Sequence, residues 1–112
     1  MHQKFPERDW KKLRSLKDSA LEKLSNRIIE KLNSLIESRE GGSHKTYLRL
    51  WETMRAEDKI VAALFDDLSR SSAIITLAGW KTHGILSDDD FNDFTEDTQN
   101  RINTLMEIMQ SE

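Results

Sequence analysis

The chain has 112 residues, no cysteine and a formal net charge of −3. Without cysteine, disulfide bonds and thiolate zinc sites are excluded, and the length is that of one domain with its own core. No run approaches the roughly 18 apolar residues of a membrane span, and the N-terminal stretch MHQKFPERDW lacks the apolar centre of a secretion signal, so we expect a cytoplasmic protein.

The first third of the chain is predicted to form two successive helices. The first should run from about Pro6 to Lys17, because proline suits the first position of a helix. The apolar residues before and after Asp18 fall on different sides of a continuous helical wheel, which predicts a kink or break there. The run from Ser19 to Glu22 matches a capping box, so the second helix should extend from this point to about Arg39.

Two glycines mark the next boundary. Gly41 and Gly42 are unfavourable inside a helix, and Ser43 is a residue type that caps helices, so a linker is predicted here. Beyond the linker, apolar side chains recur at helical spacing and predict an amphipathic helix. They are Tyr47, Leu50, Trp51 and Met54. Whether this helix breaks near residues 55–58 is left open, since neither glycine nor proline occurs there.

A long helix over about residues 57–83 is predicted to lie at the centre of the fold. Its apolar stripe keeps helical spacing. The stripe comprises Ile60, Leu64, Leu68, Ile75 and Ala78. Its second half, AIITLAGW, is apolar on nearly every side, which is typical of a helix buried by several neighbours.

This central helix is predicted to end at Gly84. Glycine readily adopts the left-handed conformation that terminates a helix. In that arrangement Trp80 and Ile85 form the apolar contact of a Schellman motif. The residues that follow should therefore begin a new element.

Two start signals follow the glycine. Ser87 with Asp90 matches a capping box, and Leu86 with Phe91 is placed as a hydrophobic staple. Thr95, followed by two acids, repeats the start signal for a last helix. The apolar residues of that last helix keep helical spacing. They are Ile102, Leu105, Met106 and Met109.

The same acidic segment partly matches a calcium-binding loop. Asp88, Asp90 and Asn92 match the first ligand positions of an EF-hand loop. The sixth position requires glycine and holds Asp93, and the twelfth requires glutamate and holds Gln99. The pattern therefore favours helix boundaries, and no metal site is predicted.

A polar cluster is predicted within the central helix. At about 100° per residue, Asp67 and Ser71 fall inside the apolar stripe, and Arg70 lies at its edge. A carboxylate on a buried stripe requires a partner. Asp67, Arg70 and Ser71 are thus candidates for a structural ion pair, or for a polar pocket or inter-subunit contact.

The N-terminal region is basic and the rest is acidic. Residues 1–40 carry ten Lys/Arg against seven Asp/Glu, whereas residues 41–112 carry seven against thirteen. The basic patch candidates, which crowd around Trp10, are Arg8, Lys11, Lys12 and Arg14. Such a cluster suits phosphates, but it also suits a solvated face or a partner for the acidic half of the chain.

No other motif points to chemistry. The histidines are far apart in sequence, and neither a zinc-protease motif nor a phosphate-binding glycine loop occurs. We therefore predict no catalytic residue and no cofactor. The methionines and tryptophans lie at helical spacing, as core residues do.

The sequence as a whole predicts an all-α, single-domain bundle of five or six helices. A non-enzymatic interaction or regulatory protein is expected, and a homodimer centred on the 60–80 segment or the last helix. Two alternatives remain. One is a nucleic-acid-associated regulator that uses the basic N-terminal helix, and the other is a small ligand-binding protein or enzyme with a site around Asp67 and Arg70.

Overall fold

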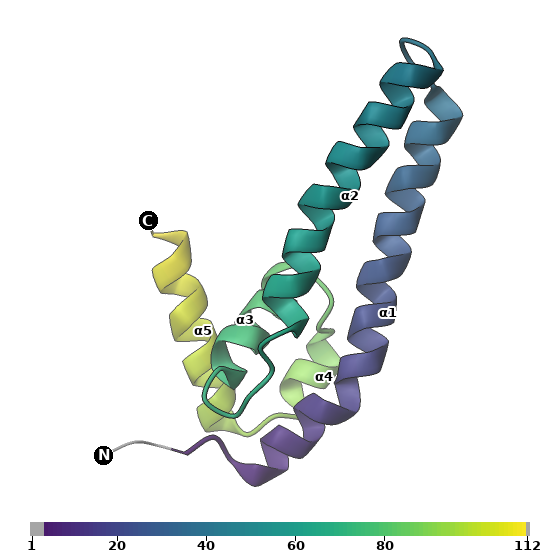
Figure 1. The fold of residues 1–112 in the computed structure, drawn as a ribbon. Helices are drawn as coiled ribbons and strands as arrows, with labels where there is room; N and C mark the ends of the chain where they lie inside the picture. The colour runs from purple at the N-terminus through teal and green to yellow at the C-terminus, as the bar shows by residue number, and fades with distance from the viewer. Residues whose placement is uncertain (1–3, 112) are drawn as a thin grey trace.

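The computed structural model describes residues 4–111, which form helices joined by short connections (Figure 1). Within this range the helices are α1 (Glu7–Ser38), α2 (Ser43–Phe65), α3 (Ala73–Thr82), α4 (Asp88–Asn92) and α5 (Glu96–Gln110). The predicted all-α class is confirmed, with five helices in the described part of the chain. None of these helices combines the length and the apolar character that crossing a bilayer requires.

The helices form an elongated molecule with two parts. The antiparallel helices α1 and α2 make a hairpin whose outer half projects from a compact body, which contains α3, α4, α5 and the first turns of α1 (Figure 1). The overall dimensions are 57 × 31 × 22 Å. The 32 residues of α1 span about 48 Å at about 1.5 Å per residue, so this one helix reaches from the body to the hairpin tip.

The predicted break near Asp18 does not occur, because α1 continues unbroken from Glu7 to Ser38; a bend, the other form of the prediction, is present. The Ser19 hydroxyl donates to the Leu16 carbonyl within the helix and caps nothing. The apolar residues of α1 shift to another side of the helix because different neighbours cover its two halves. Its first turns pack in the body, where Leu13 is fully buried, and its later turns pack along α2. Figure 1 shows α1 bending between these regions without interruption.

The predicted central helix over 57–83 is also wrong. Helix α2 runs through residues 55–58 without a break but ends at Phe65, and α3 starts only at Ala73. Serine hydroxyls hold the turn between them. The Ser72 hydroxyl donates to the Asp67 carbonyl at 2.6 Å and accepts from the Ser69 backbone N–H at 3.1 Å. Such side-chain bonds compete with the helical pattern.

The turn after α2 allows α3 to fold back and cover the end of α2. The Trp80 indole N–H donates to the Leu64 carbonyl at 3.0 Å. The ring of Trp80 also stacks on Phe65 with centroids 5.4 Å apart, and both side chains are buried. The core of the body therefore lies between these two helices, α5 and the first turns of α1.

The predicted helix boundaries at 84–87 and 95 are confirmed. Gly84 is left-handed, with φ of 69°, and the Ile85 N–H donates to the Trp80 carbonyl at 2.9 Å, which is the bond of a Schellman motif. The Ser87 hydroxyl accepts from the Asp90 N–H, and the Thr95 hydroxyl caps α5 in the same way.

The linker at the hairpin tip is confirmed as well. Gly41 and Gly42 have φ of 82° and 95°, a region that glycine adopts without strain. The residue at the N-cap position of α2 is Gly42 rather than Ser43, and no side chain caps this helix. The short connection therefore depends on backbone conformation.

We predict that Gly84→Ala lowers the free energy of unfolding by about 1 kcal/mol, because alanine resists the left-handed conformation. The added methyl would also lie 3.4 Å from a guanidinium nitrogen of Arg27. Urea unfolding followed by circular dichroism measures the change. Ser15→Ala, at an exposed position within α1, is the control and should stay within about 0.5 kcal/mol of the parent. Equal stability of both variants would contradict the assigned boundary.

Candidate functional site

The predicted polar cluster does not lie on a buried stripe. Asp67, Arg70 and Ser71 occupy the turn between α2 and α3, and all three are exposed. Arg70 turns to the start of α1, where it pairs with Glu7 at 3.2 Å and its guanidinium lies over the Trp10 ring at 5.1 Å from the centroid. The prediction that these residues share a buried helical stripe is wrong, because the helix ends at Phe65.

The buried carboxylate of this fold belongs to Asp9, which is fully buried near the start of α1. Its Oδ1 accepts from the Thr95 backbone N–H at 3.1 Å. Its Oδ2 accepts from the hydroxyls of Thr95 and Thr98 at 2.6 Å and 2.5 Å. All three partners are donors, which matches the acceptor-only chemistry of a carboxylate.

Asp9 lies near the N-terminal ends of two helices. It belongs to the first turn of α1, and it also receives hydrogen bonds at the first residues of α5. Both ends carry partial positive charge from the helix dipole, which favours a negative group. The sequence places Asp9 only among the acids of a first helical turn, because its partner threonines lie more than eighty residues away in the chain.

Half of the predicted basic patch is engaged within the chain. Lys12 pairs with Asp93 at 3.2 Å and with Asp90 at 3.5 Å, and Arg8 donates to the Asp93 carbonyl at 3.1 Å. Lys11 and Arg14 are exposed. The basic first helix and the acidic α4 thus meet in one molecule.

The hydrogen bond from Lys12 to Asp93 raises the pKa of this lysine, while partial burial opposes the rise and the charge of Asp90 adds to it. A raised pKa in the folded state means that charged Lys12 favours folding at neutral pH. That contribution is lost as the pH rises through the raised value. Lys12 is therefore a structural cation under ordinary conditions.

The acids of α4 do not assemble a metal site. Within the described residues 4–111, no three His, Asp or Glu side chains are arranged so that they could hold a metal ion. Asp88, Asp89 and Asp90 fill the first turn of α4, where the helix dipole favours them. Their position is explained by their role in the first turn of α4.

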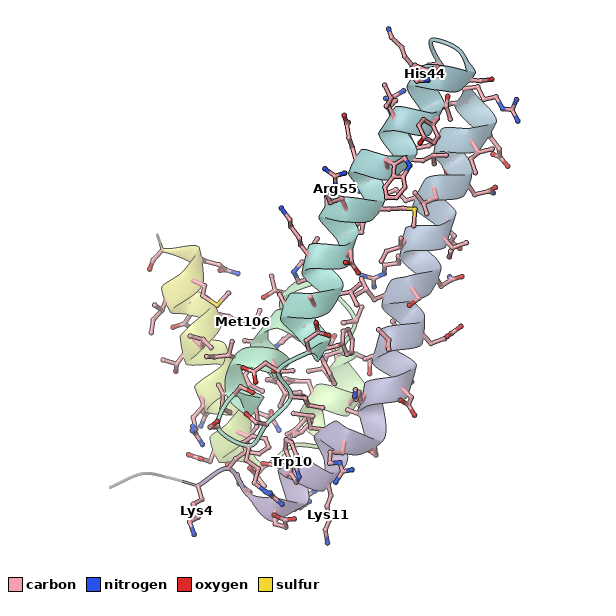
Figure 2. All side chains as sticks on the ribbon, in the orientation of Figure 1. Lys4, Trp10, Lys11, His44, Arg55 and Met106 are labelled. Atoms are coloured by element: carbon pink, nitrogen blue, oxygen red, sulfur yellow. The ribbon has the colours of Figure 1, made fainter. Side chains whose placement is uncertain are left out.

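The outer half of the hairpin presents an apolar surface that no other helix covers (Figures 1 and 2). We define the hairpin face by five exposed side chains. They are Ile29 (62% exposed), Ile36 (40%), Tyr47 (54%), Trp51 (53%) and Met54 (51%). Large apolar side chains that gather on one surface are unusual in a monomer and mark interaction sites.

Helical geometry places these five residues on the same side of the hairpin. The least exposed positions, where the helices touch, include Ile28 and Leu35 on α1. On α2 they include Thr46, Leu50 and Thr53. Each residue of the hairpin face comes directly after one of these contact positions in the sequence. In two antiparallel right-handed helices, a one-residue step turns both side chains toward the same face of the pair.

The residues that precede the contact positions are polar and face the opposite way. On α1 they include Arg27 and Ser34. On α2 they are Lys45, Arg49 and Glu52. Arg27 donates to the backbone carbonyls of His83 and Gly84, so the body packs on this polar side. The hairpin is therefore amphipathic as a unit, and its apolar side is unobstructed.

A shallow groove runs along the hairpin face. It has a volume of about 350 Å³. Its apolar lining comes from Ile28 of α1 and from Trp51, Met54 and Val61 of α2, and its charged lining from Arg55, Glu57 and Asp58. Because these side chains come from both helices, the groove confirms that α1 and α2 contribute to one surface. Grooves with this lining accept apolar side chains from a partner helix.

A comparison with protein families, curated proteins and solved structures finds no match to this chain. Among the described residues, the hairpin face is the largest group of exposed large apolar side chains.

We predict that Asp9→Ala lowers the free energy of unfolding by about 3 kcal/mol, because three donors lose their acceptor in a buried place. Asp9→Asn keeps the shape and one acceptor oxygen, so its loss should be smaller. Glu7→Ala is the matched control, since Glu7 belongs to the same helical turn but its pair with Arg70 is exposed. Chemical denaturation measures all three variants, and a loss for Glu7→Ala as large as that for Asp9→Ala would refute the assigned role.

Proposed function

We propose that the protein is a non-enzymatic helical interaction protein that self-associates, with two copies packing their hairpin faces together. The observation that supports this proposal is the set of five exposed apolar side chains along one side of a projecting hairpin. We keep the expected cytoplasmic location as part of the proposal. The association itself is the biochemical activity that we assign.

The size of the hairpin face is consistent with an interface. From the exposed fractions, its five side chains leave on the order of 500 Å² of apolar surface in water. This lies at the upper end of the patches that monomers carry, about 300–600 Å². A polar rim around it would bring each partner to the roughly 800 Å² of a standard interface.

The shape of the hairpin supports a second copy as the partner. Among the described residues, no third element covers the apolar side of this two-helix hairpin. Two such hairpins stacked face to face make a four-helix bundle, in which every helix has two neighbours. A two-fold axis brings the same surface of both copies together, as in most homodimers. The bodies lie on the polar sides of the hairpins and do not obstruct this arrangement.

The interface that we propose differs from the one expected from the sequence. The apolar residues of 60–80, a segment that the structure describes completely, are mostly buried within the chain, and Ile75 alone among the large ones is exposed. Ile108 and Met109 of α5 are exposed as well and give a smaller patch on the body. The hairpin face is larger and contains both a tryptophan and a tyrosine, the residues that most often anchor interfaces.

The alternative function in nucleic-acid binding has weaker support. Arg8 and Lys12 already contact Asp93 and Asp90, so phosphates would compete with carboxylates for them. Lys11 and Arg14 remain exposed but form too small a patch to supply the affinity that several phosphate contacts give.

We predict that sedimentation equilibrium at micromolar concentration gives twice the monomer mass of 13.1 kDa. Trp51→Glu should return the monomer mass, because a charge would be buried at the centre of the interface. Ala56→Glu is the matched control, since Ala56 is exposed on the polar side of the same helix. It should leave the dimer intact.

Two results would overturn the proposal. One is a monomer mass for the parent protein at every concentration. The other is a dimer that survives Trp51→Glu but is lost in Ile108→Glu, which would place the interface on the body. Circular dichroism confirms in each case that the variants keep their helices.

A further inference from the structure

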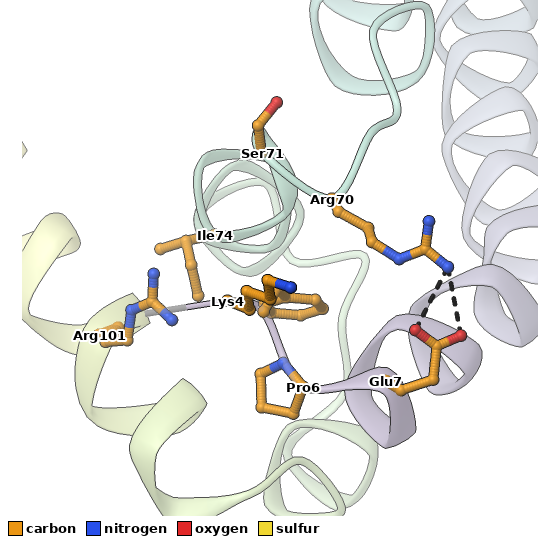
Figure 3. Close-up of a pocket in the computed structure, with 8 residues that line it drawn as sticks. Lys4, Pro6, Glu7, Arg70, Ser71, Ile74 and Arg101 are labelled. Carbon is orange, nitrogen blue, oxygen red and sulfur yellow. Dashed lines mark hydrogen bonds and ion pairs between the residues drawn. The ribbon is translucent and has the colours of Figure 1, made fainter. Parts of the chain in front are cut away.

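A pocket lies on the body, away from the hairpin face. Its volume is about 860 Å³, and it is formed where the segment before α1 crosses the turn that leads into α3 and the side of α5 (Figure 3). The lining residues are Lys4, Phe5, Pro6, Glu7, Arg70, Ser71, Ile74 and Arg101. The pocket thus combines an apolar floor with several charged groups.

The charges around this pocket are mainly positive. Its lining has three cations, Lys4, Arg70 and Arg101, and one carboxylate, Glu7, while Asp97 outside the lining forms an ion pair with Arg101. This balance is opposite to that of the whole chain, whose net charge is −3. Like charges that gather around one cavity repel each other unless an anion lies between them.

The guanidinium of Arg101 is only partly used by the protein. Its Nη1 is buried, and among the described residues it donates no hydrogen bond. The nearest carboxylate oxygen, on Asp97, is 3.8 Å away, which is too long for a hydrogen bond. A buried donor without an acceptor is unfavourable, so an oxyanion bound at this place would relieve a cost that the free protein bears.

Arg70 is fixed at another wall of the pocket. Its guanidinium is held between the Glu7 carboxylate at 3.2 Å and the Trp10 ring. Figure 3 shows Arg70 and Arg101 on opposite sides of the pocket, with Lys4 between them and Ile74 above. Because Arg70 is already ordered by its partners, little side-chain entropy is lost when an anion binds beside it.

We propose that this pocket binds a small organic oxyanion, a carboxylate or a phosphate carried on an apolar body. The anionic group is held by Arg101 and Lys4, the positive charge of Arg70 attracts it from the opposite wall, and the apolar body packs on Phe5, Pro6 and Ile74. The fork of a guanidinium suits both kinds of oxyanion, because each offers two oxygens in a plane. This site is independent of the hairpin face and of self-association.

Titration of the ¹⁵N-labelled full chain, followed by amide chemical shifts, tests the proposal. Phenyl phosphate and benzoate are the probes that carry both parts of the ligand. Benzyl alcohol carries the apolar part alone, and inorganic phosphate carries the charge alone. We expect saturable shifts in residues 4–7, 70–74 and 101 with the first two probes. Inorganic phosphate should bind more weakly, and benzyl alcohol should produce no saturable shift there.

Variants show whether the arginines cause the binding. Arg101→Gln should weaken the binding of the better probe roughly tenfold, as the loss of a charge-assisted hydrogen bond does. Arg70→Gln, at an exposed position, should also weaken the binding of this probe. It replaces Arg101→Gln as the test if that variant fails to fold. Arg55→Gln, on the hairpin, is the matched control and should leave binding unchanged.

Three outcomes would overturn the proposal. The first is the absence of saturable shifts in these residues with both complete probes. The second is binding of benzyl alcohol as tight as that of phenyl phosphate, which would show an apolar cavity without anion recognition. The third is unchanged binding in both Arg101→Gln and Arg70→Gln.

Discussion

The body of this protein depends on one buried carboxylate. Asp9 receives three hydrogen bonds from Thr95 and Thr98, and through them it ties the first turn of the first helix to the first turn of the last one. Nearby, Arg8 and Lys12 attach the same turns of α1 to α4. This point joins the starts of the first and last helices, and α3 with its fully buried Trp80 packs against both α1 and α5.

The same helix then serves a second purpose. Beyond the body, α1 continues without a break and pairs with α2 alone, so its outer turns have one neighbour instead of several. The polar side of this hairpin is attached to the body through Arg27, and the apolar side remains open. The fold therefore separates a self-contained core from a surface that is left incomplete. We propose association at that surface and ligand binding at the pocket on the body.

The parts of the fold that sequence reasoning predicted are those governed by local chemistry. Gly84, Ser87 and Thr95 mark helix ends through bonds to residues only a few positions away, and each was placed correctly. The turn after Phe65 was missed because apolar spacing continues through it, while Ser72 closes it with hydroxyl bonds that the pattern of apolar residues does not reveal.

The candidate sites were harder to predict, because they depend on distant residues. The prediction of Asp67 on a buried stripe rests on the apolar spacing that continues past Phe65, whereas the carboxylate that is buried and hydrogen-bonded is that of Asp9. The pocket joins residues near both ends of the chain, and no periodicity relates Lys4 to Arg101.

The unequal covering of α1 also has a consequence for its motions. Its turns around the fully buried Leu13 lie within the body, while those near the glycine turn have a single neighbouring helix. Hydrogen exchange along this one unbroken helix should therefore quicken toward the tip, and the hairpin can open from its end while the body stays folded.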